Sequence, residues 1–178
     1  LYNGFYGLIS YTFVRSEFSD YKGDLVASSW DSKHLLTFTL TQKLKQNWNV
    51  GMKWRYIGGL PYTPYDFEKS SMVLAWDARG REYLDYSQFN AKRLEPFHQL
   101  DLRVDKSYFF KQWTFSLYLD IQNVYNSQSN NPAKLVQVKD IDNQPIIINP
   151  GDDLAMQKYQ LKELQTTSGT VLPTIGMI

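Results

Sequence analysis

Residues 113–123 have the sequence Trp113-Thr114-Phe115-Ser116-Leu117-Tyr118-Leu119-Asp120-Ile121-Gln122-Asn123. Large apolar side chains occupy the odd positions from 113 to 121, and polar side chains occupy the even positions from 114 to 122. Neighbouring side chains of a β-strand point to opposite faces, so a strand here would have one apolar and one wettable face. About ten residues with this pattern are typical of a tilted strand that crosses a bilayer.

The same alternation recurs in five other segments, each of which predicts a strand. These segments are residues 5–13, 34–44, 48–57, 97–108 and 171–178. Charges of the predicted strands gather on the polar side, and the central part of the apolar side is nearly free of them. The charged residues on the polar side include Lys53, Arg55, Asp101, Arg103, Asp105 and Asp120. The sequence therefore predicts an all-β, antiparallel chain with an apolar face and a charged face.

The connections between the predicted strands alternate in length. The links at residues 45–48 and 109–112 are short, whereas those at 15–33, 59–96 and 126–169 are long. All three long links would lie at one end of the sheet, as in outer-membrane barrels with short periplasmic turns and long extracellular loops. Aromatic residues that could form girdles gather at both ends. They are Trp48, Tyr108, Phe109, Phe110 and Trp113 near the short turns, and Tyr11, Phe13, Tyr56 and Phe97 near the long loops.

Periodicity alone leaves a second architecture open. A soluble antiparallel sandwich or a lipocalin-like barrel would use the apolar face as its core and expose the polar face to water. The sorting of long loops to one end and of charges to one face favours the membrane barrel.

Composition excludes several classes of protein and site. The chain has 178 residues, a formal net charge of +1 and no cysteine. Lysine and arginine form no basic stripe, so no nucleic-acid partner is predicted. Without cysteine there are no disulfides, no thiolate catalysis and no thiolate metal site. The mean hydropathy of −0.44 resembles that of a soluble protein, but a barrel with only one lipid-facing side dilutes its apolar residues in the same way.

Five stretches resemble the C-terminal part of TonB-dependent outer-membrane receptors, especially those common in Bacteroidetes. The similarity follows the family's order over nearly the whole chain. The five stretches are Trp30-Asp31-Ser32-Lys33-His34-Leu35, Gly58-Gly59-Leu60-Pro61-Tyr62-Thr63-Pro64-Tyr65-Asp66, Leu100-Asp101-Leu102-Arg103-Val104-Asp105-Lys106, Leu117-Tyr118-Leu119-Asp120-Ile121-Gln122-Asn123-Val124-Tyr125-Asn126 and Leu172-Pro173-Thr174-Ile175-Gly176-Met177.

The resemblance implies that residues 1–178 are the C-terminal part of a 22-stranded barrel whose lumen holds a plug. Six strands are too few to close a membrane barrel, because the smallest have about eight. We therefore expect the chain to be a fragment, with its secretory signal, plug domain and remaining strands upstream of Leu1. The aromatic residue with which the family usually ends would lie beyond Ile178.

The resemblance further implies a place in the outer membrane of a Gram-negative bacterium and TonB-dependent uptake of a scarce ligand. Siderophores, cobalamin, glycans and peptides are all substrates of this family. The implied partners are the rest of the barrel, its plug, TonB, outer-membrane lipid and lipopolysaccharide, with a surface lipoprotein as a further candidate. A passive porin-like or structural barrel without a plug is the alternative. An enzyme is not expected, since the chain has only two histidines and no Gly-x-Ser-x-Gly motif.

Two sets of residues are candidate sites. Prolines stiffen the loop at residues 61–66 and could present its tyrosines to a ligand, although loop packing on the barrel rim would explain them too. The ligand candidates are Trp30, Asp31, Tyr62, Thr63, Tyr65 and Asp66. The charged set on the polar face could pair across strands or contact the plug. Residues 140–144 resemble a calcium loop but lack its glycine and glutamate, so they predict a hairpin turn, and no metal or cofactor is predicted.

Overall fold

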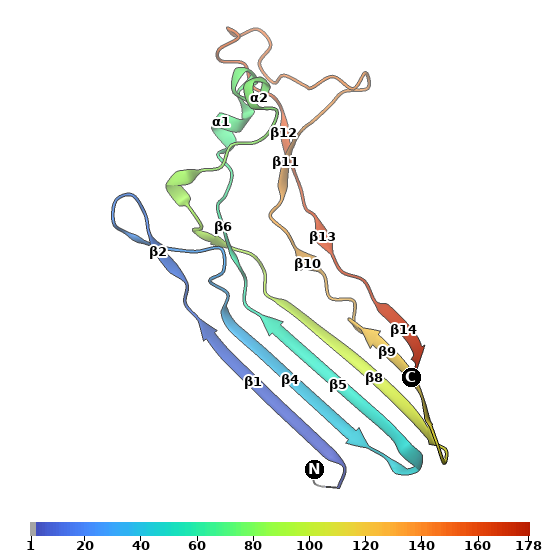
Figure 1. Ribbon diagram of the computed structural model, residues 1–178. Coiled ribbons are helices and arrows are strands. Elements are labelled where there is room, and N and C mark those ends of the chain that lie inside the picture. Colours follow the sequence, from blue (N-terminus) through green and yellow to red (C-terminus); the bar gives the residue numbers. More distant parts are fainter. Residues whose placement is uncertain (1–2) are drawn as a thin grey trace.

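The computed structural model describes residues 3–178. Six long strands form one antiparallel sheet in the order β1-β4-β5-β8-β9-β14 (Figure 1). They are β1 (Phe5–Val14), β4 (Lys33–Lys43), β5 (Trp48–Ile57), β8 (Phe97–Phe109), β9 (Thr114–Gln122) and β14 (Leu172–Met177). Each boundary lies within one residue of its prediction, so the all-β, antiparallel part of the expected fold is confirmed.

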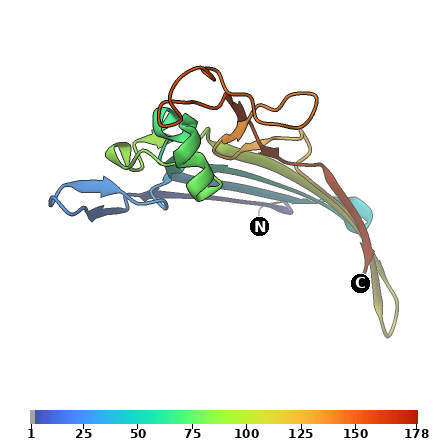
Figure 2. The same ribbon diagram turned by 90° about the horizontal axis from the view of Figure 1, so that it is seen from above.

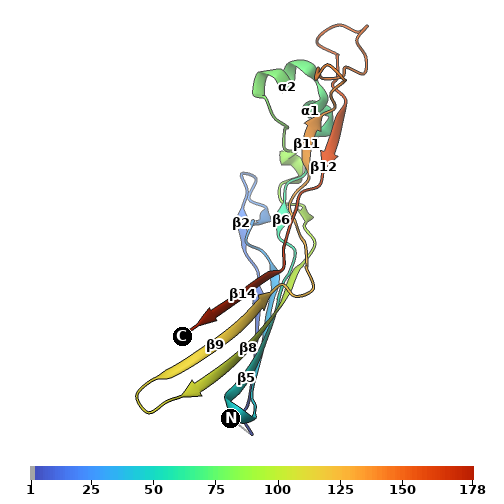
Figure 3. The ribbon, with the colours of Figure 1, turned by 90° about the vertical axis from the view of Figure 1, so that its right-hand side faces the viewer.

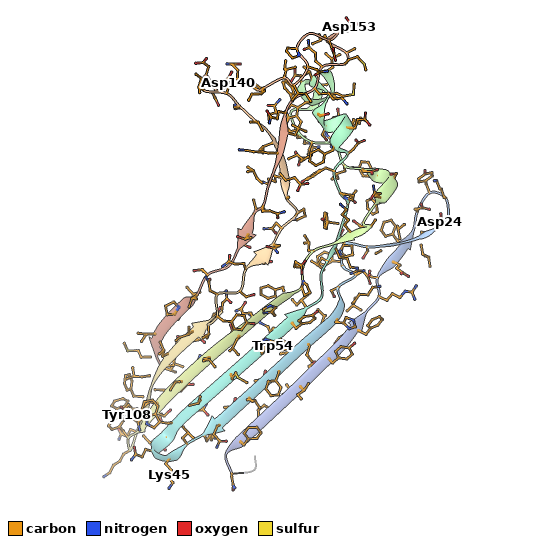
Figure 4. All side chains as sticks on the ribbon, turned by 180° about the vertical axis from the view of Figure 1, so that it is seen from behind. Asp24, Lys45, Trp54, Tyr108, Asp140 and Asp153 are labelled. Carbon is orange, nitrogen blue, oxygen red and sulfur yellow. The ribbon has the colours of Figure 1, made fainter. Side chains whose placement is uncertain are left out.

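The connections are sorted by length between the two ends of the sheet. The short 3-10 turn η1 (Lys45–Asn47) joins β4 to β5, and the turn at residues 110–113 joins β8 to β9. All three long loops lie at the opposite end, where Figure 4 labels Asp24, Asp140 and Asp153, far from Lys45 and Tyr108. The predicted asymmetry of the loops is therefore present.

The long loops contain small hairpins and helices. The paired strands are β2 (Glu17–Ser19) with β3 (Leu25–Ala27), β6 (Pro61–Tyr62) with β7 (Lys92–Arg93), β10 (Ser129–Asn130) with β13 (Thr167–Ser168), and β11 (Lys134–Gln137) with β12 (Leu161–Leu164). The helices are α1 (Phe67–Ser71), α2 (Val73–Arg79) and the 3-10 turn η2 (Tyr86–Gln88). Among residues 3–178, no helix is both long and apolar enough to cross a membrane.

The helices and the arm formed by the loop between β9 and β14 hold each other in place. The backbone amide of Val73 donates to the carbonyl of Gln157 at 3.0 Å, and that of Tyr159 donates to Ser71 at 2.7 Å. Val73 and Leu135 are the buried hydrophobic residues of the described chain, and both lie in these loops. The arm also contains the predicted turn, in which the amide of Asp140 donates to the carbonyl of Gln144.

The apolar face of the six-stranded sheet has no second layer among residues 3–178. Phe38 lies opposite Ile9 on one side and Trp54 on the other, and Trp54 lies opposite Leu100. Ile9 is 68% exposed and Ile175 is 81% exposed. Figures 2 and 3 show a thin, curved sheet whose layer of strands is not covered by another sheet or by the helices. The apolar rows of this sheet therefore have no packing partner within the described chain.

Gly59 allows two backbone segments to approach closely where β5 leads into its long loop. A Cβ atom at Gly59 would lie 1.8 Å from the carbonyl oxygen of Leu94. The amide of Leu94 in turn donates to the carbonyl of Leu60 at 3.0 Å. The position of a Cβ atom is fixed by its own backbone, and the Leu94 oxygen is a backbone atom, so a side-chain rotation could not relieve the clash.

We expect Gly59→Ala to loosen this junction by about 1–3 kcal/mol, the range found for overpacked sites. Amide exchange at Leu94 and proteolytic cleavage within residues 60–96 should both become faster. Gly151→Ala is the matched control, because a Cβ atom at Gly151 meets no atom within 4 Å. Equal behaviour of the two variants would show that the close approach at Gly59 does not matter for loop stability.

Candidate functional site

Asp31 is the centre of the loop cluster at the long-loop end. Its side chain is fully buried, and the backbone amide of Ser16 donates to Oδ1 at 2.9 Å. The Lys33 ammonium lies 2.9 Å from Oδ2, and the Arg93 guanidinium binds the same oxygen. Arg93 also donates to the carbonyls of Asp31, at 2.5 Å, and of Gly59, at 2.9 Å. One carboxylate thus joins the loop before β4 to the loop between β5 and β8.

Local backbone geometry brings these groups together. Lys33 has a φ of 61°, a left-handed conformation that is uncommon for a lysine. The carbonyl of Ser32 accepts from the amide of His34 at 2.7 Å, which closes a tight turn directly after Asp31. A Cβ atom at Gly58 would lie 2.1 Å from that Ser32 oxygen, so the turn packs against a position that requires glycine. Gly58 and Gly59 therefore pack directly against the Asp31 cluster, Gly58 on the Ser32 carbonyl and Gly59 through its hydrogen bond with Arg93.

Burial alone would raise the pKa of Asp31, but the hydrogen bonds from Lys33, Ser16 and Arg93 outweigh it and lower the pKa to about 2. The ordinary pKa of an aspartate is about 3.9. Because the pKa of Asp31 is lower in the folded state, its carboxylate stabilises the loops at every pH above the pKa of the unfolded state. This stabilisation disappears as the pH falls through the pKa of the folded state.

We therefore expect the loop cluster to open progressively between about pH 4 and pH 2. The rate of amide exchange at Ser16, corrected for the intrinsic pH dependence of exchange, should report the opening. Asp31→Asn has no charge to titrate and should lack this acid-dependent step. An identical acid profile in that variant would assign the step to other carboxylates.

The ligand candidates occupy different environments. Trp30 is 80% exposed beside the buried Asp31. The Thr63 hydroxyl accepts from the amide of Asn90 at 3.0 Å, and Asp66 caps α1 by accepting from the amide of Lys69 at 2.9 Å. Asp31, Thr63 and Asp66 therefore have partners within the chain, whereas the Trp30 side chain is open to solvent. Ligand contact by these residues stays a prediction.

Tyr62 and Tyr65 line an open cleft of about 640 Å³ between β6, β7 and the strands of the arm. Burial, followed by the neighbouring carboxylate of Glu82, raises the pKa of Tyr65 above its ordinary value. The opposite side of the cleft comes from residues more than sixty positions further along the chain. It includes Asn130, Asn131, Glu163, Gln165 and Thr167.

The six charged candidates lie on one face of the sheet, on β5, β8 and β9. Register places Lys53 opposite Asp101 and Arg103 opposite Asp120. The ion pairs that form are different: Arg55 binds Asp101 at 3.4 Å, and Arg103 binds Asp105 at 2.8 Å within β8. Within residues 3–178, Lys53 and Asp120 have no ion-pair partner.

Two polar atoms near this charged set are buried and unpaired. They are Nε of Arg55 and Oδ1 of Asn49, both on β5. Buried polar groups in native proteins almost always have a hydrogen-bond partner, so each such atom requires an explanation. The guanidinium of Arg103 is better satisfied, since it also lies 4.2 Å from the centre of the Tyr118 ring. Some charged side chains of this face thus pair with one another, and others have no partner among the described residues.

Sequence reasoning missed several residues of the loop cluster. Arg93 and Asn90 hold the loops together, and Asn131 and Gln165 line the cleft. The Gly58-Gly59 pair was the one local signal, because adjacent glycines indicate a close backbone approach.

Comparisons with protein-family models, with curated protein sequences and with solved structures found no match for this chain.

Proposed function

We propose that this chain is a wall segment of an outer-membrane β-barrel and belongs to a TonB-dependent active transporter. One observation carries the membrane part of the proposal. A single sheet has an uncovered apolar face, a charged opposite face, and all its long loops at one end. A soluble sandwich would need a second sheet on the apolar face, whereas a bilayer would cover that face directly.

The ends of the apolar face support the same proposal. Near the short turns, the Lys106 ammonium lies 5.2 Å from the Trp48 ring centre and 5.4 Å from that of Tyr108. It also donates to the backbone carbonyl of Gln46 in the turn. A lysine that extends its stem over apolar surface and its charge toward a turn is typical of a membrane interface. Lys106 would mark the periplasmic boundary of the lipid-facing band.

At the long-loop end of the sheet, each of the two histidines is hydrogen-bonded to a tyrosine. Nδ1 of His34 lies 2.9 Å from the Tyr11 hydroxyl, and Nδ1 of His98 lies 2.8 Å from the Tyr125 hydroxyl. Both histidines lie on the apolar face, opposite Phe13 and Tyr56 respectively. Amphipathic rings at this level suit the headgroup region of a bilayer.

The charged face supports a filled lumen. Lys53 and Asp120 have no ion pair among the described residues, and both side chains are at least partly exposed. A plug domain with polar groups could satisfy them, as the family resemblance implies. A porin would leave this face to water. The transporter proposal therefore rests on the resemblance together with these unpaired groups.

Conductance and TonB binding of the complete receptor test the proposal. In planar bilayers, we expect the purified full-length protein to show no steady conductance, because the plug occludes the lumen. The C-terminal domain of TonB should bind it in a pull-down. A permanently open channel that does not bind TonB would overturn the transporter assignment and favour a passive porin.

A further inference from the structure

We propose that the ammonium of Lys106 binds the phosphate of an anionic phospholipid at the short-turn end of the sheet. Lys106 follows Leu102 and Val104 at every second position of β8, so it belongs to the apolar face. In register it lies opposite Trp48 on β5 and Leu117 on β9. Within the six long strands, all of which the structure describes, no other lysine or arginine and no acid lies on this face.

The ammonium lies beside two aromatic rings and has hydrogen-bond donors left for a ligand. Its nitrogen is 5.2 Å from the ring centre of Trp48 and 5.4 Å from that of Tyr108. An ammonium group has three N–H donors, and one of them binds the backbone carbonyl of Gln46. The rings reduce the contact of the ammonium with water, which strengthens its attraction for an anion. The remaining donors can therefore bind the oxygens of a phosphate.

The short-turn end also has an excess of positive charge. Residues 43–49 and 105–116 include both short turns and contain four lysines but only one acid. That acid, Asp105, binds Arg103 at 2.8 Å. The lysines without an ion pair among residues 3–178 are Lys43, Lys45, Lys106 and Lys111. Figure 4 shows Lys45 and Tyr108 at this end. Lysines near a membrane surface attract anionic lipid headgroups.

Aromatic rings give this site the depth of the lipid headgroups. The rings of Tyr108 and Phe115 are stacked with centres 6.2 Å apart, and those of Phe110 and Trp113 are stacked at 4.1 Å. Such rings concentrate where the hydrocarbon core meets the headgroups. A phosphate bound to Lys106 would lie at that depth, and the acyl chains of the same lipid would extend over the apolar face.

The charges favour an anionic lipid over a zwitterionic one. Phosphatidylglycerol and phosphatidylethanolamine both have a phosphate, but the second also has an ammonium group. That ammonium compensates the phosphate charge and is repelled by the four lysines. Phosphatidylglycerol therefore fits this end of the sheet better. The inference rests on the membrane part of the proposed function and adds the class of lipid that the face selects.

Photo-crosslinking locates the bound lipid. Purified full-length protein is reconstituted into phosphatidylcholine vesicles with a small share of photoactivatable phosphatidylglycerol or, in a parallel sample, photoactivatable phosphatidylethanolamine. Crosslinked peptides are then identified by mass spectrometry. At residues 44–48 and 104–115 we expect a yield about fivefold higher with phosphatidylglycerol, because one lysine near a membrane surface favours an anionic lipid by about that factor.

Lys106→Gln should abolish most of this preference. Glutamine keeps a donor for the Gln46 carbonyl but has no charge. Lys106→Arg keeps the charge and should keep the preference. Lys22→Gln is the matched control, because the Lys22 ammonium also lies near a tyrosine, 5.5 Å from the ring centre of Tyr21, but in the β2–β3 hairpin at the long-loop end. Its crosslinks at the short-turn end should equal those of the wild type.

Three results would overturn the inference: equal yields with the two lipids, a preference that survives in Lys106→Gln, or phosphatidylglycerol crosslinks confined to the long-loop end. Each of them leaves lipid on the apolar face, so the membrane proposal would stand, and conductance and TonB binding would still test the transporter. A complete lack of crosslinks from either lipid to the six long strands would instead overturn the membrane proposal, and this inference with it.

Discussion

Asp31→Ala should detach the loop before β4 from the loop between β5 and β8. The substitution removes the acceptor shared by Lys33 and Arg93 and leaves their charges without a partner at the cluster. Loss of one member of a buried ion pair costs about 3–5 kcal/mol. The lower part of this range applies here, because the side chains of Lys33 and Arg93 are 34% and 35% exposed and can recruit water.

Amide exchange measures this loss locally. The amide of Ser16 should exchange on the order of a hundredfold faster in Asp31→Ala, as a loss of about 3 kcal/mol requires. Asp24→Ala is the control, since Asp24 is an exposed acid in the same loop and its carboxylate binds nothing among the described residues. If both variants exchanged at the wild-type rate, the Asp31 cluster would not hold the loops together.

Phe38→Arg should strongly destabilise the protein in a bilayer. Phe38 lies at the middle of β4 on the apolar face, opposite Ile9 and Trp54. An arginine at the midplane of the lipid face of a barrel costs about 2–4 kcal/mol. Unfolding of the full-length protein from liposomes with guanidinium should therefore show a lower free energy of unfolding by about that amount.

Thr41→Arg provides the matched control on the same strand. Thr41 lies on the polar face, opposite Tyr6 and Gly51, so an arginine there would point away from lipid. Its free energy of unfolding should remain within about 1 kcal/mol of the wild type, because substitutions on the lumen side mainly change selectivity. Equal losses in both variants would indicate that the two faces of β4 have the same surroundings.

The six strands of the sheet could be predicted because their signal is local. In β5, the residues from Trp48 to Tyr56 alternate in polarity at every step, and this period of two is the property that a half-buried strand requires. The placement of all three long loops at one end of the sheet followed from the number of residues between the strands. This local signal does not distinguish a membrane sheet from a soluble one, since a soluble sheet has the same period.

The loop structure could not be predicted because its contacts join distant residues. Arg93 binds Asp31 across 62 positions, and nothing near either residue indicates the other. The helices α1 and α2 have five and seven residues, which is too short for a helical period to emerge. The cleft combines residues of two loops, so Tyr62 and Tyr65 could be singled out while Asn131 and Gln165 could not.

Site-directed spin labelling along β9 tests most directly whether the apolar face meets lipid. Residues 1–178 contain no cysteine, so single cysteines can be placed at 115–121 in the full-length protein in liposomes once any cysteine outside these residues has been replaced. At Phe115, Leu117, Leu119 and Ile121 we expect high accessibility to oxygen and low accessibility to a nickel chelate. Ser116, Tyr118 and Asp120 should show the reverse. High nickel accessibility at all seven positions would contradict the membrane assignment.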